Sequence, residues 1–127
     1  MTISSAAVAN RYQSVQVTTC SPGQLLVMLY DGLFRFMNEA HVAMTAGIRA
    51  RAGERIGKAH AILEELLVTI DPKAPPQLLE SLTSLYRFCM SRLVEANLFQ
   101  DPTRIADVQR LLSPVRDAWR EVVNAAK

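Results

Sequence analysis

The residues that could do chemistry in this chain are few, and their spacing does not favour a metal site. The sequence holds two histidines, His41 and His60, and two cysteines, Cys20 and Cys89. Di-iron helical bundles place a Glu three residues before an inward-facing His. Here Glu39 lies only two residues before His41, so the two cannot face one metal. Neither cysteine belongs to a CxxC or another ligand spacing, and we therefore expect no metal and no cofactor.

Arg55 and His60 provide the one alternative that involves catalysis. Their spacing fits the loose Arg-x4-His pattern of RNases built on four-helix HEPN bundles. An Arg and a His at this distance arise easily by chance, and no polar residue follows Arg55. A phosphoacceptor role for His60 is disfavoured because Glu64, one turn later, would repel a phosphate. We expect no catalytic residue and no enzymatic activity, and we keep an HEPN-like RNase as the alternative.

Length and composition indicate one globular domain. The chain has 127 residues, of which 50% are hydrophobic and 20% are charged, as is typical of a single globular domain. The net charge is only +2, with no basic stripe for a nucleic-acid backbone. The start of the chain lacks a signal peptide, and the longest apolar run, residues 25–30, is too short to cross a membrane. We expect a cytoplasmic protein with no nucleic-acid partner and no membrane insertion.

Start and stop signals divide the chain into an N-terminal arm and four helices. Residues 1–20 are rich in Ser, Thr, Ala and Val without a helical period, and we expect them to form a flexible arm. The segment from Ser21 to Gln24 is typical of a capped helix start, and Gly47 is typical of a helix end. Asp71-Pro72 should end the second helix. Asp101-Pro102 should start the fourth.

Apolar side chains recur at helical spacing in each of four segments, and no segment alternates with the period of a strand. Because helices of roughly 20 residues joined by short loops pack as antiparallel neighbours, the pattern predicts an all-α fold. Residues 1–20 are the flexible N-terminal arm, and residues 21–127 form an antiparallel up-down-up-down four-helix bundle. The predicted core stripes are Leu25, Leu26, Leu29, Leu33, Phe36, Met37, Ala40 and Met44 on the first helix; Ile56, Ala59, Leu63, Leu66, Leu67 and Ile70 on the second; Leu78, Leu82, Leu85, Cys89, Leu93 and Ala96 on the third; and Ile105, Val108, Leu112, Val115, Trp119 and Val122 on the fourth.

Further large apolar side chains fall outside these stripes and predict a binding surface. Contiguous exposed apolar surface beyond a few hundred Å² usually marks an interaction site. An amphipathic partner helix lying in a groove would bury such a surface. The residues are Val27, Met28, Phe34, Ile62, Phe88, Val94, Leu98 and Phe99.

Three segments resemble the flagellar secretion chaperone FliS family. Residues 21–32, SPGQLLVMLYDG, are similar to the first-helix signature of that family, a Ser-Pro start leading to Met-Leu-Tyr-Asp-Gly. Residues 85–97 resemble its third-helix signature, through Leu-Tyr-Arg-Phe, Arg-Leu and Ala-Asn. Residues 108–119 are similar to its fourth-helix pattern, and residues 12–15 look like the start of its N-terminal segment. The likeness covers about residues 12 to 123, in order and at suitable spacing.

The resemblance implies a cytoplasmic export chaperone that binds the C-terminal region of flagellin and prevents its premature polymerisation. It also implies delivery to export-gate components of the flagellar type III secretion apparatus, with the N-terminal segment as a displaceable cover. A general adaptor for another amphipathic helix is kept as a further alternative. We expect the partner contacts to be Tyr12, Val15, Val17, Ile56, Ile62, Leu66, Tyr86, Leu93, Asn97, Ile105, Val108 and Leu112.

Overall fold

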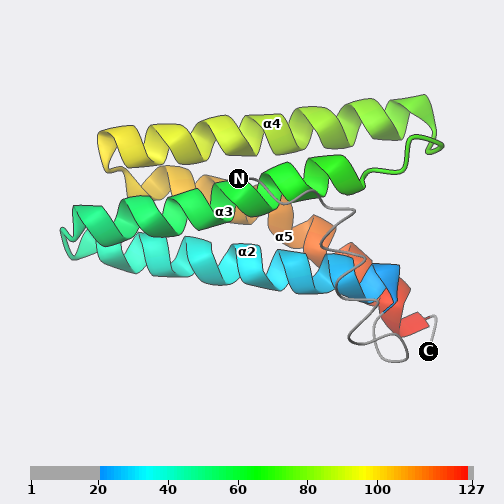
Figure 1. Ribbon diagram of the computed structural model, residues 1–127, viewed down its shortest axis with the longest axis horizontal. Helices are drawn as coiled ribbons and strands as arrows, with labels where there is room; N and C mark the ends of the chain where they lie inside the picture. The colour runs from blue at the N-terminus through cyan, green and yellow to red at the C-terminus, as the bar shows by residue number, and fades with distance from the viewer. Residues whose placement is uncertain (1–20, 126–127) are drawn as a thin grey trace.

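The computed structural model describes residues 21–125, which form a bundle of four α-helices (Figure 1). Successive helices run in opposite directions, and α2 and α4 each pack against both α3 and α5. The predicted all-α up-down-up-down bundle is therefore confirmed, whereas the predicted arm, residues 1–20, lies outside the described residues. The helices are α2 (Pro22–Thr45), α3 (Arg49–Thr69), α4 (Pro76–Phe99) and α5 (Pro102–Ala125).

The signals that were read from the sequence account for several helix ends. At the start of α2, the Gln24 backbone N–H donates to Ser21 Oγ at 3.1 Å, and the Ser21 N–H donates to Gln24 Oε1 at 2.7 Å. This reciprocal pair is the predicted capping box. Gly47 follows α2 with a φ of 77°, a left-handed conformation that glycine adopts without steric penalty. The chain can therefore reverse within a few residues and start α3.

The core follows the inner faces of all four helices, and the predicted stripes describe it with two exceptions. Leu78 and Val122 are 49% and 59% exposed because they lie at one end of the bundle. Five side chains outside the stripes are buried as well: Tyr30, Phe34, Ala43, Ala52 and Tyr86. Phe34 was predicted to be surplus apolar surface, but the guanidinium carbon of Arg116 lies 4.0 Å from its ring centroid and covers it.

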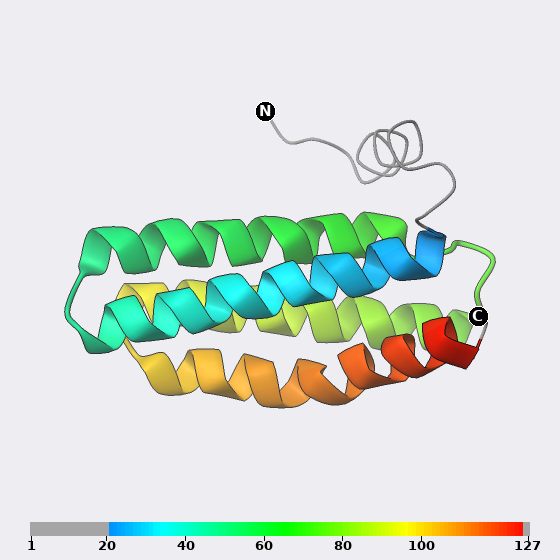
Figure 2. The ribbon, with the colours of Figure 1, turned by 90° about the horizontal axis from the view of Figure 1, so that it is seen from below.

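The start of α2, the end of α5 and the loop between α3 and α4 lie together at this end of the bundle (Figures 1 and 2). A Cβ atom added to Gly23 would lie 3.0 Å from Val123 Cγ2, so the lack of a side chain permits this close approach of α2 and α5. Farther along, Arg120 Nη2 lies 2.5 Å from Asp31 Oδ1. The last turns of α5 are thus attached to the first turns of α2.

Candidate binding surfaces

The structure places the expected contact residues in three different environments. Tyr12, Val15 and Val17 lie outside the described residues. Ile62 is half-buried and Asn97 is exposed. The other seven are 0–4% exposed in the folded bundle, and all but Tyr86 are members of the predicted core stripes, so their role as partner contacts stays a prediction. They are Ile56, Leu66, Tyr86, Leu93, Ile105, Val108 and Leu112.

Four large apolar side chains on α4 face outward, as their position outside the core stripe predicted. Phe88, Val94, Leu98 and Phe99 are between 50% and 69% exposed. We call these four residues the α4 patch. Met28 on α2 is also exposed, and Val27 is half-buried. The prediction of surplus apolar surface is therefore confirmed on α4, where it is concentrated.

Two ion pairs join α4 to α5 next to the α4 patch. Arg92 Nη2 lies 2.7 Å from Asp107 Oδ2, and Arg104 Nη1 lies 2.6 Å from Glu95 Oε2. The Arg104 guanidinium carbon is also 4.9 Å from the ring centroid of Phe99, a favourable cation–π distance. These contacts hold the ring in place while leaving it open to solvent.

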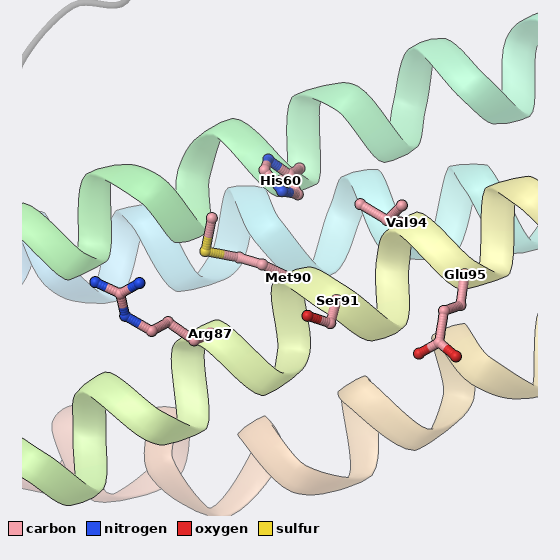
Figure 3. A pocket seen from close by; sticks show the side chains of 6 residues that line it. All are labelled: His60, Arg87, Met90, Ser91, Val94 and Glu95. Atoms are coloured by element: carbon pink, nitrogen blue, oxygen red, sulfur yellow. The ribbon is translucent and has the colours of Figure 1, made fainter.

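A shallow groove of about 480 Å³ lies between α3 and α4, and we call it the side groove. Figure 3 shows His60 on α3 and the five α4 residues that line this groove, with Val94 and Met90 on the side toward α3. Val94 belongs to both the side groove and the α4 patch, so the two surfaces are continuous. Near the groove, Asn97 lies against Gly53 of α3, whose added Cβ would be 3.4 Å from Asn97 Oδ1. Together the side groove and the α4 patch form an outward-facing surface suited to an amphipathic segment.

A second groove, of about 510 Å³, lies between α2 and α3 around Ile62. A Cβ atom added to Gly32 would lie 3.3 Å from Ile62 Cδ1, so the glycine leaves room for the Ile62 side chain. Phe36 and Met28 add apolar lining, and Arg35 adds a cation at the rim. Ile62 therefore lies in a groove wall, as a contact residue would.

A third groove, of about 610 Å³, opens at the end of the bundle where the start of α2 meets the end of α5. We call it the end groove. The end groove was not predicted from the sequence, because the residues that line it follow the core stripes. Most of them lie near the ends of those stripes. An up-down-up-down order brings these helix ends together, and this predicted order was the feature of the sequence that could have indicated a groove here. The main apolar lining is Leu26, Ile70, Leu78, Leu82, Val115, Trp119 and Val122.

Tyr86 forms the floor of the end groove, with Tyr30 and Cys89 in the buried core behind it. The hydroxyls of Tyr30 and Tyr86 share a hydrogen bond of 2.5 Å, and both side chains are buried. Burial raises the pKa of both tyrosines above its ordinary value. Burial also raises the pKa of the Cys89 thiol to about 12. All three groups are therefore neutral near pH 7, and the floor suits an apolar ligand.

The arrangement of Arg55 and His60 does not support the RNase alternative. Arg55 Nη1 lies 3.4 Å from Glu39 Oε1 of α2, whereas His60 faces α4 and its Nδ1 lies 2.9 Å from Glu64 Oε1. The two side chains point to different neighbouring helices and do not meet at one site. In residues 21–125 no cluster of His, Cys, Asp and Glu suits a metal ion. None of the helices in that range has the length and apolar character needed to cross a membrane.

Comparison with known proteins gives these surfaces a biological setting. Residues 4–126 match the family model described as flagellar protein FliS. This chain belongs to the FliS family. The flagellar secretion chaperones FliS of Bacillus subtilis strain 168 and of Campylobacter jejuni are each 32% identical to it, over 116 and 115 residues. These alignments cover 91% of this chain in both cases, and 86% and 90% of the two relatives.

The FliS of Escherichia coli K12 is also 32% identical, over 106 residues that cover 83% of this chain and 78% of that protein. The chain therefore belongs to a family of flagellar secretion chaperones, which are not enzymes. Its exposed apolar surfaces are therefore best understood as places to hold a protein partner.

Proposed function

We propose that this chain is a cytoplasmic export chaperone that binds the C-terminal region of flagellin. It prevents premature polymerisation and delivers the subunit to export-gate components of the flagellar type III secretion apparatus. The observation that carries the proposal is the exposed α4 patch, next to the side groove, in a member of a flagellar secretion chaperone family.

The α4 patch and the side groove are the proposed main contact with flagellin. Phe88 and Phe99 lie on the side of α4 next to α5, whereas Val94 lies toward α3 and Leu98 is exposed. A helix lying across α4 could bury apolar side chains on both sides of it. Burying one leucine side chain contributes about 1.5–3 kcal/mol, so a few such contacts can offset the cost of ordering a flexible partner. Asn97 would add a contact at the edge of this surface, whereas Ile62 would contact the partner in the second groove, between α2 and α3.

The N-terminal arm is proposed to cover the end groove until flagellin displaces it. Val17 is five residues before Pro22, and an extended chain of that length spans about 17 Å. Residues 12–17 can therefore reach the groove that opens beside the start of α2. Tyr12, Val15 and Val17 supply apolar side chains that suit its lining of leucine, valine and tryptophan.

Calorimetric titration with a peptide from the C-terminal region of flagellin tests the main proposal. The wild-type chain should bind this peptide and should not bind a scrambled peptide of the same composition. Leu98→Glu should weaken binding at least tenfold, because a buried leucine contact of about 1.4 kcal/mol or more is replaced by a charge. Leu111→Glu is the matched control, since Leu111 is an exposed leucine on α5 that lines none of the three grooves.

Absence of binding by a folded wild-type chain would refute the proposed function. Equal weakening by Leu98→Glu and Leu111→Glu would refute the assignment of the contact to the α4 patch. Binding of unrelated amphipathic helices with the same affinity would favour a general adaptor. Removal of residues 1–20 should speed peptide association if the arm is a cover, and unchanged association would refute that role.

A further inference from the structure

Among the described helices, α5 alone has a proline beyond its first turn, at Pro114. Proline lacks a backbone N–H, so it cannot donate to the carbonyl of Arg110 four residues earlier, and its ring clashes with that carbonyl. Sharp bends in helices commonly arise at such positions. Figure 2 shows α5 bending, with its second half turned away from the line of its first half. Pro114 therefore divides α5 into residues 102–113 and residues 115–125.

The first of these segments is fixed firmly in the bundle. It contains every buried side chain of α5, namely Ile105, Val108 and Leu112. It also carries both close ionic contacts with α4, made by Arg104 and Asp107. Movement of this segment would expose core surface and break those contacts.

The second segment has fewer ionic contacts, although Arg116 packs over the Phe34 ring of α2, with its guanidinium carbon 4.0 Å from the ring centroid. Val115 and Trp119 are only half-buried, and Val122 is exposed. Its one interhelical ion pair among the described residues joins Arg120 to Asp31 of α2, and both side chains are more than 40% exposed. Exposed ion pairs contribute little stability. No ion pair joins the part of this segment that the structure describes to α4.

The end groove lies between the second segment and α4, where no ion pair of the described residues joins the two. Leu78 and Leu82 of α4 form one wall, and Val115, Trp119 and Val122 form the other. Pro114 itself lies at the inner end of the second wall. A rotation about Pro114 would therefore change the width of the groove without disturbing the buried part of α5.

We propose that Pro114 is a hinge and that residues 115–125 are a movable wall that sets which partner side chains the end groove admits. Large apolar side chains such as Phe, Leu or Met would enter when the wall moves away from α4. The proposal rests on the proposed function for the identity of the partner, whose helix would supply these side chains. Apparent affinity then depends on the fraction of molecules with an open groove, and a continuous helix would reduce that fraction.

Hydrogen–deuterium exchange in the free protein tests the hinge without any partner. In the wild type, the amides of residues 115–119 should exchange at least tenfold faster than those of residues 106–110. Pro114→Ala should slow exchange at residues 115–119 at least tenfold, because alanine restores the missing hydrogen bond and favours helix. Glu121→Ala is the matched control: it also introduces alanine at an exposed position of the same segment, and exchange at residues 115–119 should not change.

Stopped-flow fluorescence of Trp119, the single tryptophan of the chain, tests the effect on binding. Pro114→Ala should reduce the association rate of the flagellin peptide about tenfold, whereas Glu121→Ala should leave it unchanged. Uniform exchange along wild-type α5, or wild-type exchange and association in Pro114→Ala, would overturn the hinge. If the wild-type chain binds no flagellin peptide, the proposed function fails, and the exchange experiment alone then decides the hinge.

Discussion

Removal of one hydroxyl from the buried Tyr30–Tyr86 pair should destabilise the bundle, and the two removals should differ in their effect. The two hydroxyl oxygens are 2.5 Å apart, and the side chains are 0% and 2% exposed. A buried hydroxyl without a partner costs about 1–3 kcal/mol. The Trp119 side chain also interacts with the Tyr30 hydroxyl and opposes the rise of its pKa, so Tyr86→Phe leaves the Tyr30 hydroxyl with one polar neighbour. Tyr30→Phe, in contrast, leaves the Tyr86 hydroxyl with no hydrogen-bond partner among the described residues.

We expect a loss of about 2–3 kcal/mol in unfolding free energy for Tyr30→Phe and about 1 kcal/mol for Tyr86→Phe. The double variant should lose no more than Tyr30→Phe alone, because it leaves no tyrosine hydroxyl at this position to be unsatisfied. Urea unfolding followed by far-ultraviolet circular dichroism measures all three values, and this signal avoids the fluorescence of nearby Trp119. Losses that add to within about 0.5 kcal/mol would refute a shared hydrogen bond, and a larger loss for Tyr86→Phe would refute the role given to Trp119.

Three further predictions concern stability. Burial raises the pKa of Cys89 from 9.0 to about 12, so its contribution to stability is complete below pH 9 and is lost as the pH rises toward 12. The unfolding free energy, measured with denaturant between pH 8 and 11, should therefore fall with pH more steeply in the wild type than in Cys89→Ala. The two slopes should differ by up to about 1.4 kcal/mol per pH unit, and equal slopes would contradict the raised pKa of Cys89. Ser21→Ala removes the cap of α2 and should lower the unfolding free energy by about 1 kcal/mol; an unchanged melting temperature would show that the capping box contributes nothing. Leu93→Ala should cost about 2–5 kcal/mol because its side chain is fully buried, whereas Leu98→Ala should stay within about 0.5 kcal/mol, and similar losses for the two would contradict their burial.

The helices could be predicted from the sequence because their ends depend on local chemistry. The capping pair of Ser21 and Gln24 and the φ value of Gly47 each involve residues close together in the chain. The outward direction of Leu98 followed in the same way from its angle to the core stripe of its own helix. Such features need no knowledge of which helices become neighbours.

Other features depend on neighbours that periodicity does not specify. Phe34 lies outside the stripe of α2 but is buried because Arg116 of α5 packs over its ring. Leu78 and Val122 follow their stripes but are exposed because the bundle opens where they lie. Helical spacing also placed expected contact residues such as Leu66 at inner-face positions, where they are buried in the folded bundle. Knowledge of which helix ends meet would have separated the core from the end groove.

The close approach of Gly23 and Val123 has a practical consequence for experiments with this protein. Because α2 begins and α5 ends at the same end of the bundle, affinity tags or fluorescent proteins fused directly before Pro22 or after Ala125 attach at the end that carries the end groove. An insertion at Gly47, at the opposite end, would keep a label away from that groove. The same geometry suits circular permutation, with a short linker joining the start of α2 to the end of α5 and new ends opened at Gly47.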